Sequence, residues 1–128
     1  MAWDLKSDRP IYTQLLEQIQ IKIISGEFLP GDKLPSVRDL AADAAVNPNT
    51  MQKALTELER SGLVYAQRTS GRFITEDKEM LKKVKQEIAK EQIDEFVNSM
   101  KKLGFTPEDI LSLMEKTVKD GGESHGRK

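Results

Sequence analysis

Two neighbouring stretches decide the fold of this chain: LPSVRDLA at residues 34–41 and VNPNTMQKAL at residues 46–55. Each is typical of a short helix. Ser36 is placed to cap the first helix, and Asn47, followed by Pro48 in the first turn, is placed to cap the second. Two short helices with a tight connection predict a helix-turn-helix, whose second helix enters the major groove of DNA.

The second of these helices has two different faces. Apolar residues recur at i, i+3, i+4 and i+7, which predicts a buried stripe. The stripe consists of Met51, Ala54, Leu55 and Leu58, and the opposite face carries Asn49, Gln52, Lys53 and Thr56. Amide side chains pair with adenine edges, and threonine contacts thymine methyl groups or phosphates. The polar face therefore predicts DNA contacts, although a polar face that is merely solvated is the alternative for a single helix.

The first helix repeats the pattern of a packed scaffold. Val37, Leu40, Ala41 and Ala44 follow the same helical spacing. Ser36 and Asp39 are placed to form a capping-box pair. Arg38 is left on the outer side near the helix start, where we expect a phosphate or guanine contact. The alternative for Arg38 is a surface salt bridge with Asp39 or Asp43.

A β-hairpin is expected directly behind the second helix. Gly62 ends that helix, residues 63–68 read as a strand, 69–71 as a turn and 72–75 as a returning strand. Arg68 and Arg72 flank the turn, so the hairpin predicts a wing that lays cations along the DNA backbone. The alternative for Arg68 is an edge-strand charge that discourages aggregation.

A third helix is expected ahead of this unit, over residues 11–25. Its apolar stripe consists of Tyr12, Leu15, Leu16, Ile19, Ile23 and Ile24, and Gly26 ends it. Residues 27–32 then form a turn that Phe28 and Leu29 anchor to the core. The order helix, turn, helix, helix, hairpin predicts a winged helix-turn-helix.

Four stretches of the chain resemble the GntR family of bacterial transcription regulators. They are PIY at residues 10–12, GEFLPGDKLPSVRDLA at 26–41, NPNT at 47–50 and ELERSG at 57–62. The resemblance runs over roughly residues 9 to 75. The short C-terminal part resembles the YtrA subfamily, which lacks a large effector domain. That resemblance implies a neighbouring transporter operon and the regulator's own promoter as targets.

The resemblance also implies DNA-binding roles for the Arg of the Pro-Ser-x-Arg motif, for the start of the second helix and for the wing. With the arguments above, the expected DNA-binding residues are Ser36, Arg38, Asn47, Asn49, Thr50, Gln52, Lys53, Arg68, Ser70, Gly71 and Arg72. Some GntR regulators carry arginines at the positions of Pro48 and Gln52, so their base preference does not transfer to this chain.

The charge of the chain is balanced rather than basic. Residues 1–75 contain nine Lys/Arg and nine Asp/Glu, and residues 76–128 contain eleven and twelve, which together give the net charge of −1. A specific reader of duplex DNA needs cations at the groove rather than a high overall charge. We therefore expect modest non-specific affinity and a limited loss of affinity with added salt.

The remaining composition excludes several classes. The 128 residues allow one core of about 65 to 75 residues and a smaller appendage. There is no cysteine, which excludes disulfides and thiolate metal sites. No long apolar run is present and residues 1–8 are too polar for a signal peptide, so a cytoplasmic location is expected. Neither paired carboxylates nor a nucleophile with a base is evident, so we expect no catalytic residue, metal or cofactor and no enzymatic activity.

Residues 76–119 predict a helical dimerisation domain. A long Lys- and Glu-rich helix ends at Gly104, and Thr106, Pro107 and Asp109 start a second helix. Their apolar faces need a partner. The expected dimerisation residues are Leu81, Val84, Ile88, Phe96, Val97, Met100, Ile110, Leu113 and Met114. The alternative is that these helices pack back on the first helix of the same subunit.

These patterns predict a mainly α-helical protein with a small β-hairpin. A winged helix-turn-helix covers residues 1–75, a two-helix dimerisation domain covers 76–119, and a flexible tail with the single histidine, His125, covers 120–128. The expected function is that of a homodimeric regulator, with repression favoured, on a palindromic operator. The other class is a winged-helix module that binds protein instead of DNA. A small-molecule effector between the C-terminal helices stays open, because no polar constellation for one is visible.

Overall fold

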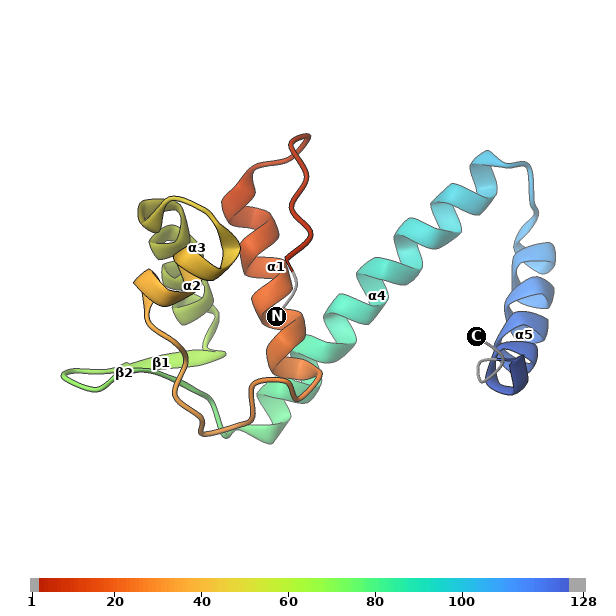
Figure 1. Cartoon of the computed structure of the whole chain (residues 1–128). Helices are drawn as coiled ribbons and strands as arrows, with labels where there is room; N and C mark the ends of the chain where they lie inside the picture. Colours follow the sequence, from red (N-terminus) through yellow and green to blue (C-terminus); the bar gives the residue numbers. More distant parts are fainter. Residues whose placement is uncertain (1–2, 125–128) are drawn as a thin grey trace. The chain divides into compact units, whose positions relative to one another are not determined.

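The structure, a computed structural model, describes residues 3–124. The elements in chain order are α1 (Ile11–Ile24), α2 (Val37–Ala44), α3 (Pro48–Ser61), β1 (Val64–Gln67), β2 (Gly71–Ile74), α4 (Lys78–Lys102) and α5 (Pro107–Ser124) (Figure 1). The chain divides into two compact units, Met1–Gln86 and Glu87–Lys128. The boundary between these units lies inside α4, about two and a half turns of helix after its start. The mainly helical fold with one hairpin confirms the predicted fold class.

The core of the first unit is built from the three predicted helical stripes. Helix α3 packs against both α1 and α2. The buried residues from these helices are Leu15, Ile19, Ile23, Leu40, Ala41, Ala44, Met51, Ala54, Leu55 and Leu58. Nine of these ten residues are Leu, Ile or Ala, whose burial without polar atoms supplies the main stabilising term of the unit. The predicted stripes are thereby confirmed.

Local hydrogen bonds begin and end the helices as the sequence predicts. Ser36 Oγ accepts from the backbone N–H of Asp39 at 3.1 Å, and Asn47 Oδ1 accepts from that of Asn49 at 2.7 Å. Ala45 ends α2 in the left-handed region at φ 59°, which reverses the chain within one residue. A non-glycine residue there is uncommon and carries strain. This tight reversal sets α3 across α2.

The two strands of the hairpin have four residues each and are close to the predicted ranges. β1 and β2 pair antiparallel from Val64↔Ile74 to Gln67↔Gly71, and residues 68–70 form the turn. A third segment joins the other edge of β2: Lys33 bridges Phe73, and the backbone N–H of Leu34 donates to the carbonyl of Arg72 at 2.8 Å. From the sequence, only a turn is expected near this segment. This pairing connects the segment that precedes α2 with the wing.

The turn after α1 is anchored by one residue rather than two. Phe28 is partly buried against the core, as predicted, but the Leu29 side chain is 55% exposed. The prediction for Leu29 was therefore wrong. Two hydrogen bonds close this turn instead. The backbone N–H of Phe28 donates to the carbonyl of Lys22, and the N–H of Leu29 donates to the carboxylate of Asp32.

The second unit consists of the C-terminal part of α4 and of α5. The N–H of Phe105 reaches the carbonyl of Met100 at 3.2 Å and that of Gly104, at φ 98°, reaches Lys101 at 2.9 Å, which is a Schellman ending. Thr106 and Asp109 then exchange both hydrogen bonds of the predicted capping box. Ile110 is 3% exposed, but other apolar side chains of this unit are open to solvent.

Two predictions for this region need correction. Leu81 and Val84, expected at a dimer interface, pack with Met80 against the core of the first unit. They belong to the part of α4 that precedes Gln86, and a neighbouring core surface in the same chain was available to cover them. The predicted tail also starts too early, because α5 continues to Ser124. His125 lies outside the described residues. None of the described helices is long and apolar enough to cross a bilayer.

Candidate nucleic-acid interface

The start of α3 presents polar side chains to solvent. Asn49, Gln52 and Lys53 are exposed and Thr50 is half-buried. Gln52 Nε2 lies 3.3 Å from Thr56 Oγ1, which keeps the amide along the helix surface. None of these side chains is covered by the fold, as a groove-reading surface requires. Asn47 differs, because its side-chain oxygen is used in the cap.

Lys53 is held by a contact that spacing did not predict. Its Nζ lies over the Tyr12 ring, 4.0 Å from the centroid. The ring belongs to α1, so the contact joins the first helix to the exposed face of α3. A cation over an aromatic face is attracted by the ring quadrupole. The ammonium of Lys53 is therefore restrained rather than free to sweep through solvent.

Arg38 stands at the start of α2 with its charge uncompensated. It is exposed and makes no ion pair within the described residues. The alternative salt bridges with Asp39 or Asp43 are not formed. Asp43 instead accepts from Trp3 Nε1 at 2.8 Å. An unpaired guanidinium in the first turn of α2 is suited to contact phosphate or guanine.

The wing turn carries a second uncompensated arginine. Arg68 and Ser70 lie in the exposed turn between β1 and β2, and Arg68 has no ion pair within the described part of the chain. Gly71 follows at φ 104°, a conformation that favours glycine. Figure 1 shows the hairpin projecting from the helices of its unit. Because Arg68 is in the turn, the edge-strand alternative does not apply.

Arg72 lies elsewhere than predicted. It pairs with Ala66 inside the ladder rather than flanking the turn, and its Nε donates to Glu59 Oε1 at 3.0 Å. Its side chain is 20% exposed. Strand alternation explains this position, since Arg72 shares a face with the buried Ile74 two residues on. That signal was present in the sequence.

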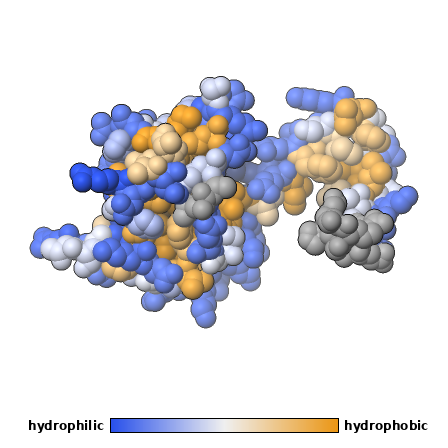
Figure 2. Space-filling model, in the orientation of Figure 1, coloured by the Kyte–Doolittle hydropathy of each residue, from blue (hydrophilic) through white to orange (hydrophobic). Residues whose placement is uncertain are grey.

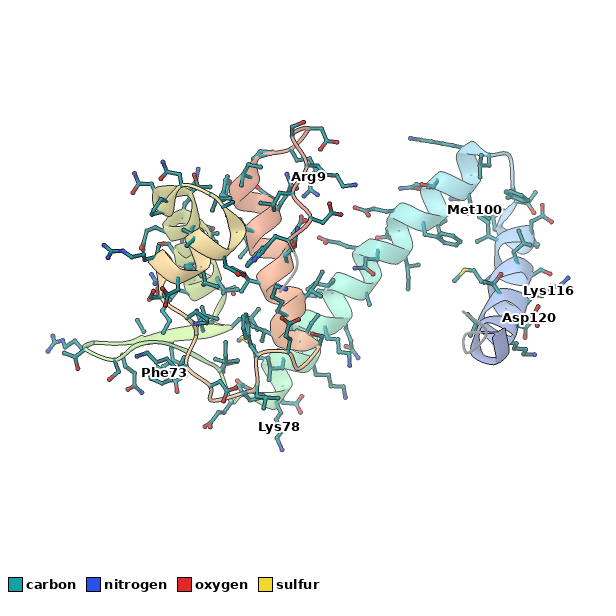
Figure 3. All side chains as sticks on the ribbon, viewed as in Figure 1. Arg9, Phe73, Lys78, Met100, Lys116 and Asp120 are labelled. Carbon is teal, nitrogen blue, oxygen red and sulfur yellow. The ribbon has the colours of Figure 1, made fainter. Side chains whose placement is uncertain are left out.

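Lys33 was missed altogether. Its backbone pairs with Phe73 (labelled in Figure 3), and its side chain lies against Gly71 of the wing. Helical and strand periodicity cannot predict an isolated bridge between distant segments. The position of Lys33 beside the wing is therefore visible only in the folded structure. Among the residues that the structure describes, no cluster of three or more His, Asp or Glu forms a metal site.

The comparisons with known proteins agree with this geometry. The model of the family described as "Bacterial regulatory proteins, gntR family" matches residues 11–74. The HTH-type transcriptional repressor YtrA of Bacillus subtilis is 42% identical over 73% of each chain. This chain belongs to the GntR family, in its YtrA subfamily.

Two further matches extend over most of the chain of this GntR protein, and a third covers 59% of it. The uncharacterized HTH-type transcriptional regulator YhcF of Bacillus subtilis is 44% identical over 91% of this chain and 96% of its own. A GntR family transcriptional regulator from Listeria monocytogenes has a solved structure with a TM-score of 0.80, 38% identity, and coverage of 88% of this chain and 98% of its own. The DNA-binding domain of AraR, solved in complex with operator ORE1, has a TM-score of 0.51 and 31% identity over 59% of this chain and 94% of its own. The GntR chain described here is thus a DNA-binding transcriptional regulator rather than an enzyme.

Proposed function

We propose that this GntR protein is a repressor that binds a palindromic operator as a homodimer, with the start of α3 in the major groove and the hairpin along the backbone. The observation that carries the proposal is the exposed polar tip of α3 together with two unpaired arginines, Arg38 and Arg68. Asn49 and Gln52 offer amides to base edges, and the N-terminus of α3 offers its positive dipole end to phosphate.

The remaining predicted residues take supporting roles in this proposal. Thr50, Lys53 and Ser70 offer groups for phosphate contacts, and Gly71 permits the backbone of the wing to approach the DNA closely. Asn47 and Ser36 fix the helix starts through their caps. Arg72 acts indirectly in this arrangement, since its guanidinium is paired with Glu59.

A homodimer is supported by the second unit. Ile93, Phe96, Leu103, Leu111, Leu113 and Val118 are exposed there. Figure 2 shows hydrophobic residues gathered over α5 and the end of α4. A groove of about 410 Å³ lined by Phe96, Met100, Leu113, Met114, Thr117 and Val118 runs between these helices. Exposed apolar surface of this kind is typical of an interface. A dimer with two-fold symmetry would place one copy of α3 at each half-site of a palindromic operator.

Repression is supported by the relatives. YtrA and NagR of Bacillus subtilis are both named as HTH-type transcriptional repressors, at 42% and 34% identity to this chain. A regulator of this size represses most simply by occupying an operator that overlaps a promoter.

The proposal is tested by substituting the exposed groups without touching the core. Arg38→Ala and Asn49→Ala are each expected to abolish tight binding to a duplex selected by the wild-type protein from a random library. Circular dichroism and sedimentation should stay unchanged, because both side chains are exposed. Arg60→Ala is the matched control, since Arg60 is 72% exposed near the far end of α3. Retention of wild-type affinity by both Arg38→Ala and Asn49→Ala would refute the proposed surface.

A further inference from the structure

The wing sheet has an inner face on the core and an outer face toward solvent. Val64, Ile74 and Leu34 are buried on the inner face. Tyr65 and Phe73 pair across β1 and β2 on the other face and stack with ring centroids 5.9 Å apart. Lys33 bridges Phe73 from the third segment, so its side chain leaves the sheet on this outer face.

Glycine at position 71 lets the Lys33 side chain lie flat on the strand. A Cβ built on Gly71 would lie 3.1 Å from Lys33 Cε and 3.9 Å from Nζ. Gly71 is two residues nearer the turn than Phe73, or about 7 Å along the strand. The side chain therefore carries its ammonium from the Phe73 register toward the turn that holds Arg68.

The ammonium of Lys33 is uncompensated. Lys33 is exposed and has no ion pair within residues 3–121. Two acids of this region are engaged elsewhere: Asp32, the neighbour of Lys33 in the chain, accepts from the N–H of Leu29, and Glu59 of α3 pairs with Arg72 of β2. Among the described residues, this end of the wing thus has two cations without an ion pair, Lys33 on the outer face and Arg68 in the turn.

We propose that Lys33 is a DNA-contacting residue of the wing, whose ammonium binds a backbone phosphate and whose position is set by the missing side chain of Gly71. Because the lysine comes from the segment that leads into α2, one phosphate contact ties the wing and the entry to α2 to the same strand of DNA. This inference rests on the proposed DNA-binding surface.

The test measures how affinity depends on salt. The slope of log K against log salt is negative. Its magnitude falls by about 0.9 for each phosphate that loses its cation, and a lower slope here means a smaller magnitude. Lys33→Met keeps the alkyl stem and removes the charge. For each lost contact, of which the proposed homodimer has two, it should reduce the magnitude of the slope by about 0.9 and weaken binding by about 3- to 10-fold at 0.1 M salt. Lys82→Met is the matched control, because Lys82 is exposed on α4. The probe is the library-selected duplex, with fluorescence anisotropy as readout.

A second variant tests the role of the glycine. Gly71→Ala should displace Lys33 and lower the slope as Lys33→Met does, and it should cause no further slope change in the Lys33→Met background. The inference is overturned if Lys33→Met keeps the wild-type slope while Arg68→Ala lowers it. If Arg38→Ala and Arg68→Ala also behave as wild type, the proposed surface itself fails, so the two failures are distinguishable.

Discussion

The guanidinium of Arg72 in the wing donates to the carboxylate of Glu59 near the end of α3, at 3.0 Å, with side chains 20% and 34% exposed. The two residues are thirteen positions apart and are separated by β1 and the turn. The pair therefore links the hairpin directly to the helix whose start is proposed to read DNA. A contact at this place restrains the wing relative to α3.

We predict that this ion pair couples the stability of the wing to α3. Double-mutant cycles with Glu59→Ala and Arg72→Ala, followed by urea unfolding, should give a coupling energy of about 0.5–1 kcal/mol. Arg72→Ala should weaken DNA binding without lowering the salt slope, because its charge is already paired. The exposed pair Glu57–Arg60, with Arg60 72% exposed, is the control and should couple less. A slope reduction equal to that of Arg68→Ala would instead make Arg72 a direct phosphate contact.

The contact between Lys53 and the Tyr12 ring predicts a different pattern. Tyr12→Phe keeps an aromatic face and should keep the coupling, whereas Tyr12→Leu should lose about 0.5–1 kcal/mol of it. The measurement is the unfolding free energy of each variant with and without Lys53→Met. If Lys53→Met costs the same in the Tyr12→Leu background as in the wild type, the cation–π contact contributes nothing.

The proposed dimer predicts that a charge on the exposed apolar face separates the subunits. Leu111→Glu and Val118→Glu alter side chains that are 68% and 72% exposed in the single chain. A buried unpaired carboxylate at an interface should weaken association by about 100-fold or more. Sedimentation equilibrium over a range of concentrations measures this.

The control for the dimer test lies on the same unit. Lys90→Ala changes a residue that is 78% exposed on α4 and should leave association intact. Thermal unfolding of the winged unit should be the same in all these variants, because its core lies in the other compact unit. A wild-type protein that sediments as a monomer at micromolar concentration would refute the dimer.

The first three helices could be predicted almost to the residue because their signals are local. The stripe from Met51 to Leu58 and the caps at Ser36 and Asn47 all act within one or two turns of helix. The exposure of Asn49 and Gln52 follows from the same spacing. The Thr106–Asp109 box was equally predictable for that reason.

Most of the misses have a different cause, since they depend on what a residue meets from a distant segment. The 31–34 segment pairs with β2 across some forty residues, which brings Lys33 to the wing. Leu81 has the same apolar character as Phe96, yet only Leu81 finds a core within its own unit. The continuation of α5 through Gly121 also runs against helix propensity.

The sequence by itself determined the helices, the hairpin, the polar tip of α3 and the family, because periodicity, caps and turns are written in contiguous residues. Only the tertiary structure decided which cations are free. Within the described residues, Arg38, Arg68 and Lys33 have no ion pair. By contrast, Arg72 pairs with Glu59, and Lys53 lies over the ring of Tyr12. The physical reason is that pairing depends on distances between segments, and these exist only once the chain has packed.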